Sequence, residues 1–571
     1  MPETTDNPDI KSPPPILEAI QYNPAEFANL LAKCAKTQID TVNAKVHLVF
    51  LLEYLDHLNA KTIVVEREYT DRHFLDDYAA YYVRCLDKYT SRCTRLHFFT
   101  ECFDTERLKP SSVESRNETQ QFLQECYLGF VVIKPLPQRF IGRTCLRTYP
   151  QDEPNHTTAD VREYPVKRKY DVHIVGFDLY VESIAFQEQD HVVAACATSA
   201  LWSAFHGTSE LFKHAIPTPI EITRLATEHS PSDSRHLPNS GLVPYQMAEA
   251  IKHTGLEPEL LGCTNEFIFK ASLYAYLNMG LPVILTGALY DTSAMFEAKL
   301  PNGKTCSFPK FSGLHAVTVL GFRRRTDMAP QDEIPNTSLE SSKMTTIYVH
   351  DDQVGPFARM KFCDAPLQTC DFRQGNITEN SLVLNTSWMG ENGKLDVVKF
   401  VPWTMLLPLY SKIRIRFIQI LSEVLSLDLA VRAIINPING NHDVKIDWNI
   451  FLSFSSDFKS DMRNASIDND LKWKCIECAT PRFIWRAIAS VAGDPIIELI
   501  YDATDIEDSH DLLQWIIPHH KDLYRLLTDF AAESKLRGLA DMVIKNLRQV
   551  FSEFHSSISW CSYLEKESYG I

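Results

Sequence analysis

The sequence predicts an α+β protein with about three domains. The chain has 571 residues, and a single hydrophobic core usually stops growing near about 250 to 300 residues. Strand-like apolar runs alternate with amphipathic helical patterns up to about residue 400, and longer helical patterns follow Pro402. The hydrophobic content of 45% is enough for a core in each domain.

These patterns divide the chain into segments of different character. Residues 1–15 are polar and rich in proline and should form a disordered tail. Residues 16–170 have the pattern of an α/β domain, to which the sequence assigns no role. Residues 171–400 hold the chemistry-bearing motifs, and the polar stretch 323–343 inside them is interpreted as an inserted surface loop. Residues 401–571 are expected to form a mainly helical C-terminal domain.

Charge and composition narrow the range of partners. A formal net charge of −16 opposes non-specific binding to nucleic acid or to an anionic membrane. The N-terminal stretch lacks the features of a secretory signal, and the fourteen cysteines are scattered, so we expect reduced thiols in a cytoplasmic protein. No glycine-rich phosphate loop and no zinc-type spacing is apparent, so no cofactor and no metal is predicted. The oligomeric state is not predicted.

Cys196 is the candidate nucleophile. It precedes a run whose apolar residues recur at helical spacing, so we expect it at the first turn of a buried helix. There, unpaired N–H groups and the positive end of the helix dipole favour the thiolate, the nucleophilic form of cysteine. The alternative interpretation is a structural core cysteine, the commonest role of a free cysteine.

Two further residues downstream complete a possible catalytic set. The run SGLHAVTVLGF places His315 at the start of a strand, and TTIYVHDDQVGPF places Asp351 and Asp352 at the end of another. A nucleophilic cysteine needs a base within hydrogen-bond reach, and the base needs an acceptor that fixes its tautomer. Cysteine, histidine and aspartate in these contexts supply all three parts.

The same motifs resemble those of the papain-like cysteine peptidases, most closely the bacteriocin-processing, double-glycine type. The resemblance is carried by QDHVVAACATSALW around Cys196, by Gly280–Ile284, by His315–Phe322 and by Ile347–Asp351. It implies a central domain in which a helix bearing the cysteine packs on an antiparallel sheet bearing the histidine and the aspartate.

The resemblance also implies a role for each residue. Cys196 would be the nucleophile, His315 the base and then the acid, and Asp351 the group that orients His315. Gln189 would donate to the oxyanion with the backbone N–H of Cys196. The family's glutamine usually stands six residues before the cysteine, where this chain has Asp190, and a carboxylate cannot donate unless it is protonated.

Of the two adjacent acids, Asp351 aligns better with the family's strand-end aspartate. Side chains of neighbouring strand residues point to opposite faces, so only one of Asp351 and Asp352 is expected to approach His315.

The predicted function is therefore thiol-dependent hydrolysis of a peptide or isopeptide bond, with a protein or peptide as substrate. Two alternatives stay open: a transglutaminase or acyltransferase, which uses the same constellation with a different acceptor, and a catalytically inactive peptidase fold that serves as a binding module.

Overall fold

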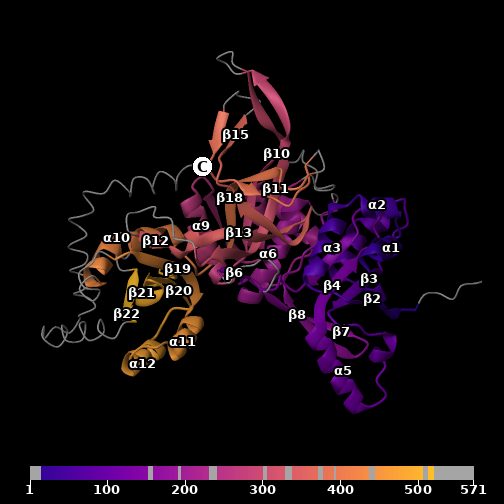
Figure 1. Cartoon of the computed structure of the whole chain (residues 1–571), viewed down its shortest axis with the longest axis horizontal. Coiled ribbons are helices and arrows are strands. Elements are labelled where there is room, and N and C mark those ends of the chain that lie inside the picture. The colour runs from indigo at the N-terminus through magenta and orange to yellow at the C-terminus, as the bar shows by residue number, and fades with distance from the viewer. Residues whose placement is uncertain are drawn as a thin grey trace, which may run out of the picture.

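The protein has a mixed α+β structure built mainly on antiparallel sheets (Figure 1). The computed structural model describes residues 15–151, 159–190, 195–229, 241–299, 305–327, 337–370, 377–390, 394–435, 444–505 and 512–519. Within these ranges the helices and strands gather around three larger sheets, and only β12 of the third sheet interrupts their order along the chain.

The N-terminal sheet has the strand order β1-β2-β3-β4-β5, with every neighbouring pair antiparallel. Its strand β4 is buried along its whole length, as a strand covered on both faces must be. The strands are β1 (Leu17–Gln21), β2 (Thr62–Tyr69), β3 (Cys93–Phe99), β4 (Tyr127–Ile133) and β5 (Ile141–Leu146). The helices are α1 (Pro24–Ala35), α2 (Ile39–Asn43), α3 (Val46–His57), α4 (Arg72–Ala80) and α5 (Val113–Cys126).

The central sheet closes on itself. Its strands follow the path β10-β11-β13-β14-β17-β18-β9, and β18 also pairs with β10. The strands are β9 (Leu256–Gly262), β10 (Val283–Lys299), β11 (Thr305–Arg325), β13 (Met344–Asp351), β14 (Gly355–Phe362), β17 (Leu384–Asn385) and β18 (Val398–Tyr410), with β6 (Asp160–Glu163) paired to β11. Two hairpins lie outside it, β7 (Arg168–Ile174) with β8 (Phe177–Ser183) and β15 (Leu367–Cys370) with β16 (Ile377–Asn380).

Helix α6 (Cys196–Phe212) packs against β11 of this sheet (Figure 1). Thirteen of its residues, from Ala197 to Ser209, are buried. A side-chain bond fixes the two elements to each other, because Thr318 Oγ1 on β11 donates to the carbonyl of Ala200 over 2.6 Å. The helices α7 (Pro219–Thr227), α8 (Pro244–His253) and α9 (Glu266–Asn278) complete this part of the chain.

The third sheet corrects the expected character of residues 401–571. Its order is β12-β19-β20-β21-β22, so the described part of this segment is not mainly helical. The strands are β12 (Thr337–Leu339), β19 (Ile446–Phe454), β20 (Phe483–Val491), β21 (Asp494–Asp502) and β22 (Leu513–Pro518), and the helices are α10 (Phe417–Ile435), α11 (Ser455–Asn464) and α12 (Asn469–Glu477). The helices expected beyond residue 519 lie outside the described residues.

The physical reason for this difference is visible in β19 and in the hairpin that follows. Buried and partly exposed residues alternate along β19, which is the period of a strand and not of a helix. Ala492 and Gly493 join β20 to β21, and both have positive φ, as the two-residue turns of tight hairpins require. Apolar runs of this length fit either element, and this turn decides between them.

The predicted boundaries also shift. The stretch 323–343 is not simply a surface loop, because β11 continues to Arg325 and β12 pairs in parallel with β19 of the third sheet. Residues 328–336 of that stretch lie outside the described residues. Strand β18 runs to Tyr410 inside the central sheet, so the central unit extends beyond residue 400.

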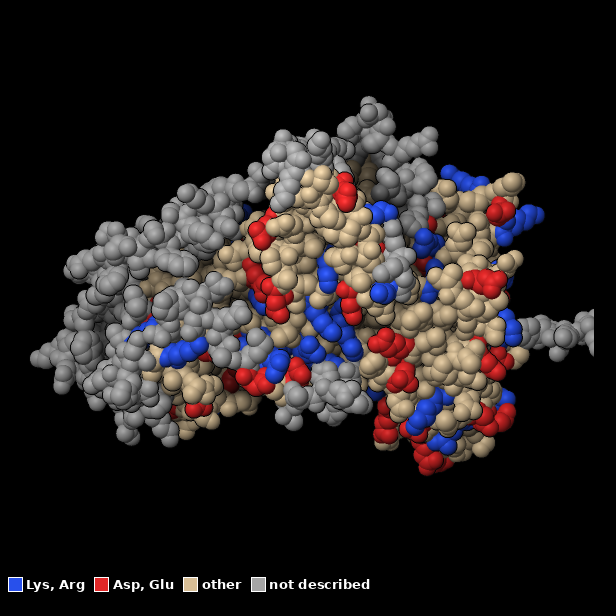
Figure 2. All heavy atoms as spheres, turned by 45° about the horizontal axis from the view of Figure 1, so that its top comes forward, with Lys and Arg blue, Asp and Glu red and all other residues tan. Residues whose placement is uncertain are grey.

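The surface shown in Figure 2 mixes charges of both signs, with basic side chains near the middle of this face and acidic ones beside them. Across the part of the chain that the structure describes, no helix is both long enough and apolar enough to cross a membrane.

We predict that Gly287→Ala destabilises the central sheet. A Cβ at this position would lie 2.2 Å from the carbonyl oxygen of Val401 on β18, so the two strands would have to separate. Overpacking of this kind costs about 1 to 3 kcal/mol, measured as a lower free energy of unfolding in urea. Gly262→Ala is the matched control, because no atom lies within 4 Å of its would-be Cβ on β9. Equal losses in the two variants would contradict this account of the closed sheet.

Candidate active site

Cys196 is the first residue of α6. The preceding Ala195 cannot cap the helix with its side chain, so the first N–H groups keep their positive potential at the cysteine. The Cys196 side chain is half-buried. Residues 191–194, just before it, lie outside the described residues. The helix therefore brings a thiol, at its positive end, to the surface of the central sheet.

On the sheet, His315 is the residue that lies beside this thiol. The imidazole is buried on β11, and its Nε2 lies 3.0 Å from Oδ1 of Asp351. The side chain of Cys196 lies beside the same ring and contributes to its raised pKa. Because Nε2 faces the carboxylate, Nδ1 is the nitrogen left for the sulfur. The structure thus brings together three of the residues predicted from the sequence: Cys196, His315 and Asp351.

Asp351 is held by donors on both of its oxygens. Trp388 Nε1 donates to Oδ2 over 2.7 Å, and the backbone N–H of Gln353 donates to Oδ1 over 3.1 Å. Burial alone would raise the pKa of Asp351, but the charge of His315 and the hydrogen bonds from His315 and Trp388 lower it overall. The carboxylate is therefore ionised and fixed in orientation.

The carboxylate of Asp351 also sets the pKa of His315. Burial opposes the imidazolium, but the negative charge of Asp351 and the hydrogen bonds to Asp351 and Cys196 raise the pKa of His315 well above its ordinary value. The raised pKa makes the ring a strong base, which suits it to accept a proton from the neighbouring thiol.

Asp352 lies closer to the imidazole than strand alternation predicts. Its Oδ1 is 3.9 Å from His315 Nε2 and accepts no hydrogen bond from the described residues. The pairing of β13 with β14 is irregular between Val349 and Asp351, so regular alternation of faces ends there. Burial raises the pKa of Asp352 to about 7, and the adjacent charge of Asp351 adds to this. Asp351 alone is within hydrogen-bond distance of the ring.

Gln189 and Asp190 are both buried, immediately before the residues that the structure leaves undescribed. Tyr82 O–H donates to Oδ2 of Asp190 over 2.8 Å, so this carboxylate has a partner in the N-terminal part of the chain. The neighbouring Glu188 pairs with Lys45. These contacts fix the backbone next to Gln189. The role of Gln189 as oxyanion donor stays a prediction.

Trp388 is the site residue that the sequence analysis missed. It lies 37 positions after Asp351, and its indole ring packs edge to face on His315 with the centroids 5.1 Å apart. A tryptophan has a single donor and usually finds a partner when buried. That general rule is the only signal in the sequence, because nothing local connects this residue to the aspartate.

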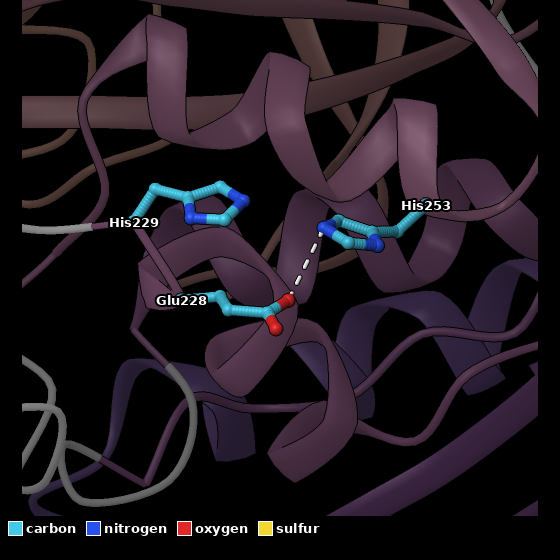
Figure 3. A group of neighbouring side chains, drawn as sticks. All are labelled: Glu228, His229 and His253. Carbon is cyan, nitrogen blue, oxygen red and sulfur yellow. Dashed lines mark ion pairs between the residues drawn. The ribbon is translucent and has the colours of Figure 1, made fainter.

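Among the residues that the structure describes, two groups of side chains have the composition of a metal site. One is His315 with Asp351 and Asp352. Here Nε2 and Oδ1 are in direct hydrogen-bond contact and two further donors occupy Asp351, which is the geometry of an oriented base. The other consists of Glu228, His229 and His253, which are exposed and converge on one point (Figure 3).

No protein-family model matches this chain, and no curated protein matches its sequence.

We predict that Asp352→Asn stabilises the protein more at pH 8 than at pH 5. Because the pKa of Asp352 is raised to about 7 on folding, the folded state binds this proton more tightly than the unfolded chain. Stability is therefore lost as pH rises from about 4, the ordinary value, to about 7. Asparagine cannot ionise, so the variant escapes this loss. Urea unfolding at both pH values measures the difference.

Asp351→Asn is the matched control with the opposite sign. The lowered pKa of Asp351 contributes stability that is present above its unfolded-state pKa of about 4 and is lost as pH falls through the folded-state value. This variant should be less stable than the parent at neutral pH. A difference between Asp352→Asn and the parent that does not change with pH would refute the assignment of a raised pKa.

Proposed function

We propose that this protein is a thiol-dependent hydrolase of peptide or isopeptide bonds, with a papain-like central domain. The observation that carries the proposal is the buried, hydrogen-bonded pair of His315 and Asp351 with the Cys196 side chain beside the imidazole ring. A structural cysteine has no need of a buried, charge-paired histidine beside it. Perturbed ionisation that comes from a specific partner is instead characteristic of catalytic sites.

In the first half of the reaction the Cys196 thiol transfers its proton to Nδ1 of His315, and the thiolate sulfur attacks the carbonyl carbon of the substrate. The carbonyl π electrons move to oxygen and form an oxyanion. As the oxyanion re-forms the carbonyl, the C–N bond breaks and the leaving amine takes the proton from Nδ1. The products are the free amine and a thioester on Cys196.

In the second half His315 removes a proton from water, which attacks the thioester carbonyl. The C–S bond then breaks, the sulfur regains the proton from His315, and a carboxylic acid leaves. Asp351 stays ionised and stabilises the imidazolium at each stage. We assign oxyanion stabilisation to the backbone N–H of Cys196 and to Gln189.

The arrangement of elements supports the papain-like part of the proposal. The cysteine begins a helix packed on a sheet, while histidine and aspartate come from two adjacent antiparallel strands of that sheet, β11 and β13. The N-terminal and C-terminal parts of the chain would select the substrate. Every cysteine among the described residues is a free thiol, which accords with the proposed cytoplasmic location.

We predict that Cys196→Ala and His315→Ala each lower hydrolysis by at least about a thousandfold, because the members of such a unit do not act separately. The assay is a digest of a proteome-derived peptide library, with new termini identified by mass spectrometry. Cys102→Ala is the matched control, since Cys102 is an exposed thiol that no part of the mechanism uses.

Three results bear on the alternatives. Cleavage by Cys196→Ala at the parent rate would reject the nucleophile. Incorporation of a labelled amine by the parent protein in place of hydrolysis would replace the hydrolase with a transglutaminase or acyltransferase. A parent protein that binds peptides but neither cleaves them nor transfers them to the amine would reject the enzyme in favour of the binding module.

A further inference from the structure

A second cluster of chemically capable side chains lies away from the catalytic line, at the ends of α7 and α8. It consists of Glu228, His229 and His253, with one ligand atom from each lying within 4.8 Å of the other two. Figure 3 shows the two imidazole rings and the carboxylate directed toward a common point. All three side chains are exposed, so an ion from solution can reach them.

The spacing already approaches that of a zinc site. With bonds of about 2.0 to 2.1 Å, two ligands of a tetrahedral zinc ion lie about 3.3 Å apart. Glu228 Oε2 and His253 Nε2 are 3.4 Å apart, so this pair needs almost no adjustment. The ligand nitrogen of His229 must move toward the other two ligand atoms by at most about 1.5 Å. A small rotation of an exposed side chain provides such a movement.

The helices hold these residues in a favourable field. Glu228 directly follows α7, and His253 is the last residue of α8, so both stand where helix carbonyls carry partial negative charge. Such ends stabilise cations. The helices are themselves fixed to each other, since buried residues of both, including Ile222 and Ile251, belong to one hydrophobic cluster.

A further carboxylate adds to the negative potential. Glu249 stands one turn before His253 on α8, and residues four apart share a helix face. It interacts electrostatically with both His229 and His253. Its own ion pair, with Lys252 at 2.8 Å, lies at the surface and is partly exposed, so it is weak. Glu249 is thus a ready partner for the outer side of a metal-bound histidine or for a bound water.

We propose that Glu228, His229 and His253 form a binding site for one divalent transition-metal ion of the zinc type, with water as the fourth ligand. Two imidazoles and one carboxylate are a donor set that suits Zn²⁺ and excludes the all-oxygen preference of Mg²⁺ and Ca²⁺. The ion clips the end of α7 to the end of α8.

A metal ion at this site would act on α7, which contacts the helix that carries Cys196. Thr223 of α7 hydrogen-bonds to Thr198 of α6 over 3.2 Å, two residues from Cys196. A metal that binds only the folded state stabilises it. The gain grows with the logarithm of the ratio of the free metal concentration to the dissociation constant. Zinc is therefore expected to raise the melting temperature of the protein, whether or not it has hydrolase activity.

The test is calorimetric titration of the full chain, freed of metal by dialysis against EDTA, with ZnCl₂ under reducing conditions. Removal of groups beside metal ligands costs about 10- to 100-fold in affinity, and loss of a direct ligand costs at least as much. Glu228→Gln should therefore weaken binding at least about tenfold, and the double variant His229→Ala, His253→Ala should abolish this site and the zinc-dependent rise in melting temperature. Circular dichroism checks that each variant is folded.

His173→Ala is the matched control. His173 forms an exposed pair with Asp178, at 2.6 Å, that belongs to neither metal-capable group, so this variant should bind zinc like the parent. Co²⁺ as a second probe should give the absorption of a tetrahedral nitrogen and oxygen site, without sulfur-to-cobalt bands. Unchanged binding in the double variant, an equal loss in the control, a thiolate spectrum or no binding by the parent would each overturn the proposal.

Discussion

The buried pair between His315 and Asp351 is the interaction on which the rest of this structure depends. An ionised carboxylate away from water is tolerated only when it is paired and hydrogen-bonded. The imidazole supplies the opposite charge at 3.0 Å, and Trp388 and the backbone of Gln353 satisfy the remaining acceptor positions. The middle of β11, the end of β13 and a segment after β17 must therefore meet at one point. Removing any of them would leave a buried charge uncompensated.

The central sheet meets this requirement by its topology. Strands β11 and β13 are direct neighbours, which places His315 and Asp351 side by side, and the pairing of β18 with β10 closes the sheet behind them. The hydrogen bond from Thr318 to the carbonyl of Ala200 then fixes the position of α6 along β11. With the helix fixed in this way, its first residue can only lie at the histidine. The position of Cys196 is thus a consequence of packing that extends well beyond the site.

What the sequence could predict was local. Helical spacing after Cys196 and the apolar runs at His315 and Asp351 predicted a helix and two strands, which the structure describes, but His315 lies in the middle of β11 and not at the start of a strand. Contacts between distant segments left no such trace. Nothing near Trp388 indicates a bond to an aspartate 37 positions earlier, and the approach of Asp352 depends on a strand irregularity that alternation cannot predict. The parallel pairing of β12 with β19 left no local signal either, because it joins segments that are far apart in sequence.

The central claim is that His315 activates Cys196, and the most direct measurement is the order in which the thiols react. Brief iodoacetamide treatment at about pH 6, followed by peptide mass mapping, should label Cys196 before the exposed Cys102, because an imidazolium neighbour favours the thiolate. The buried Cys145 should be among the slowest, since burial raises its pKa to about 12. In His315→Ala the preference for Cys196 should vanish. Labelling that favours Cys102, or that is unchanged by loss of the histidine, would contradict the activated pair.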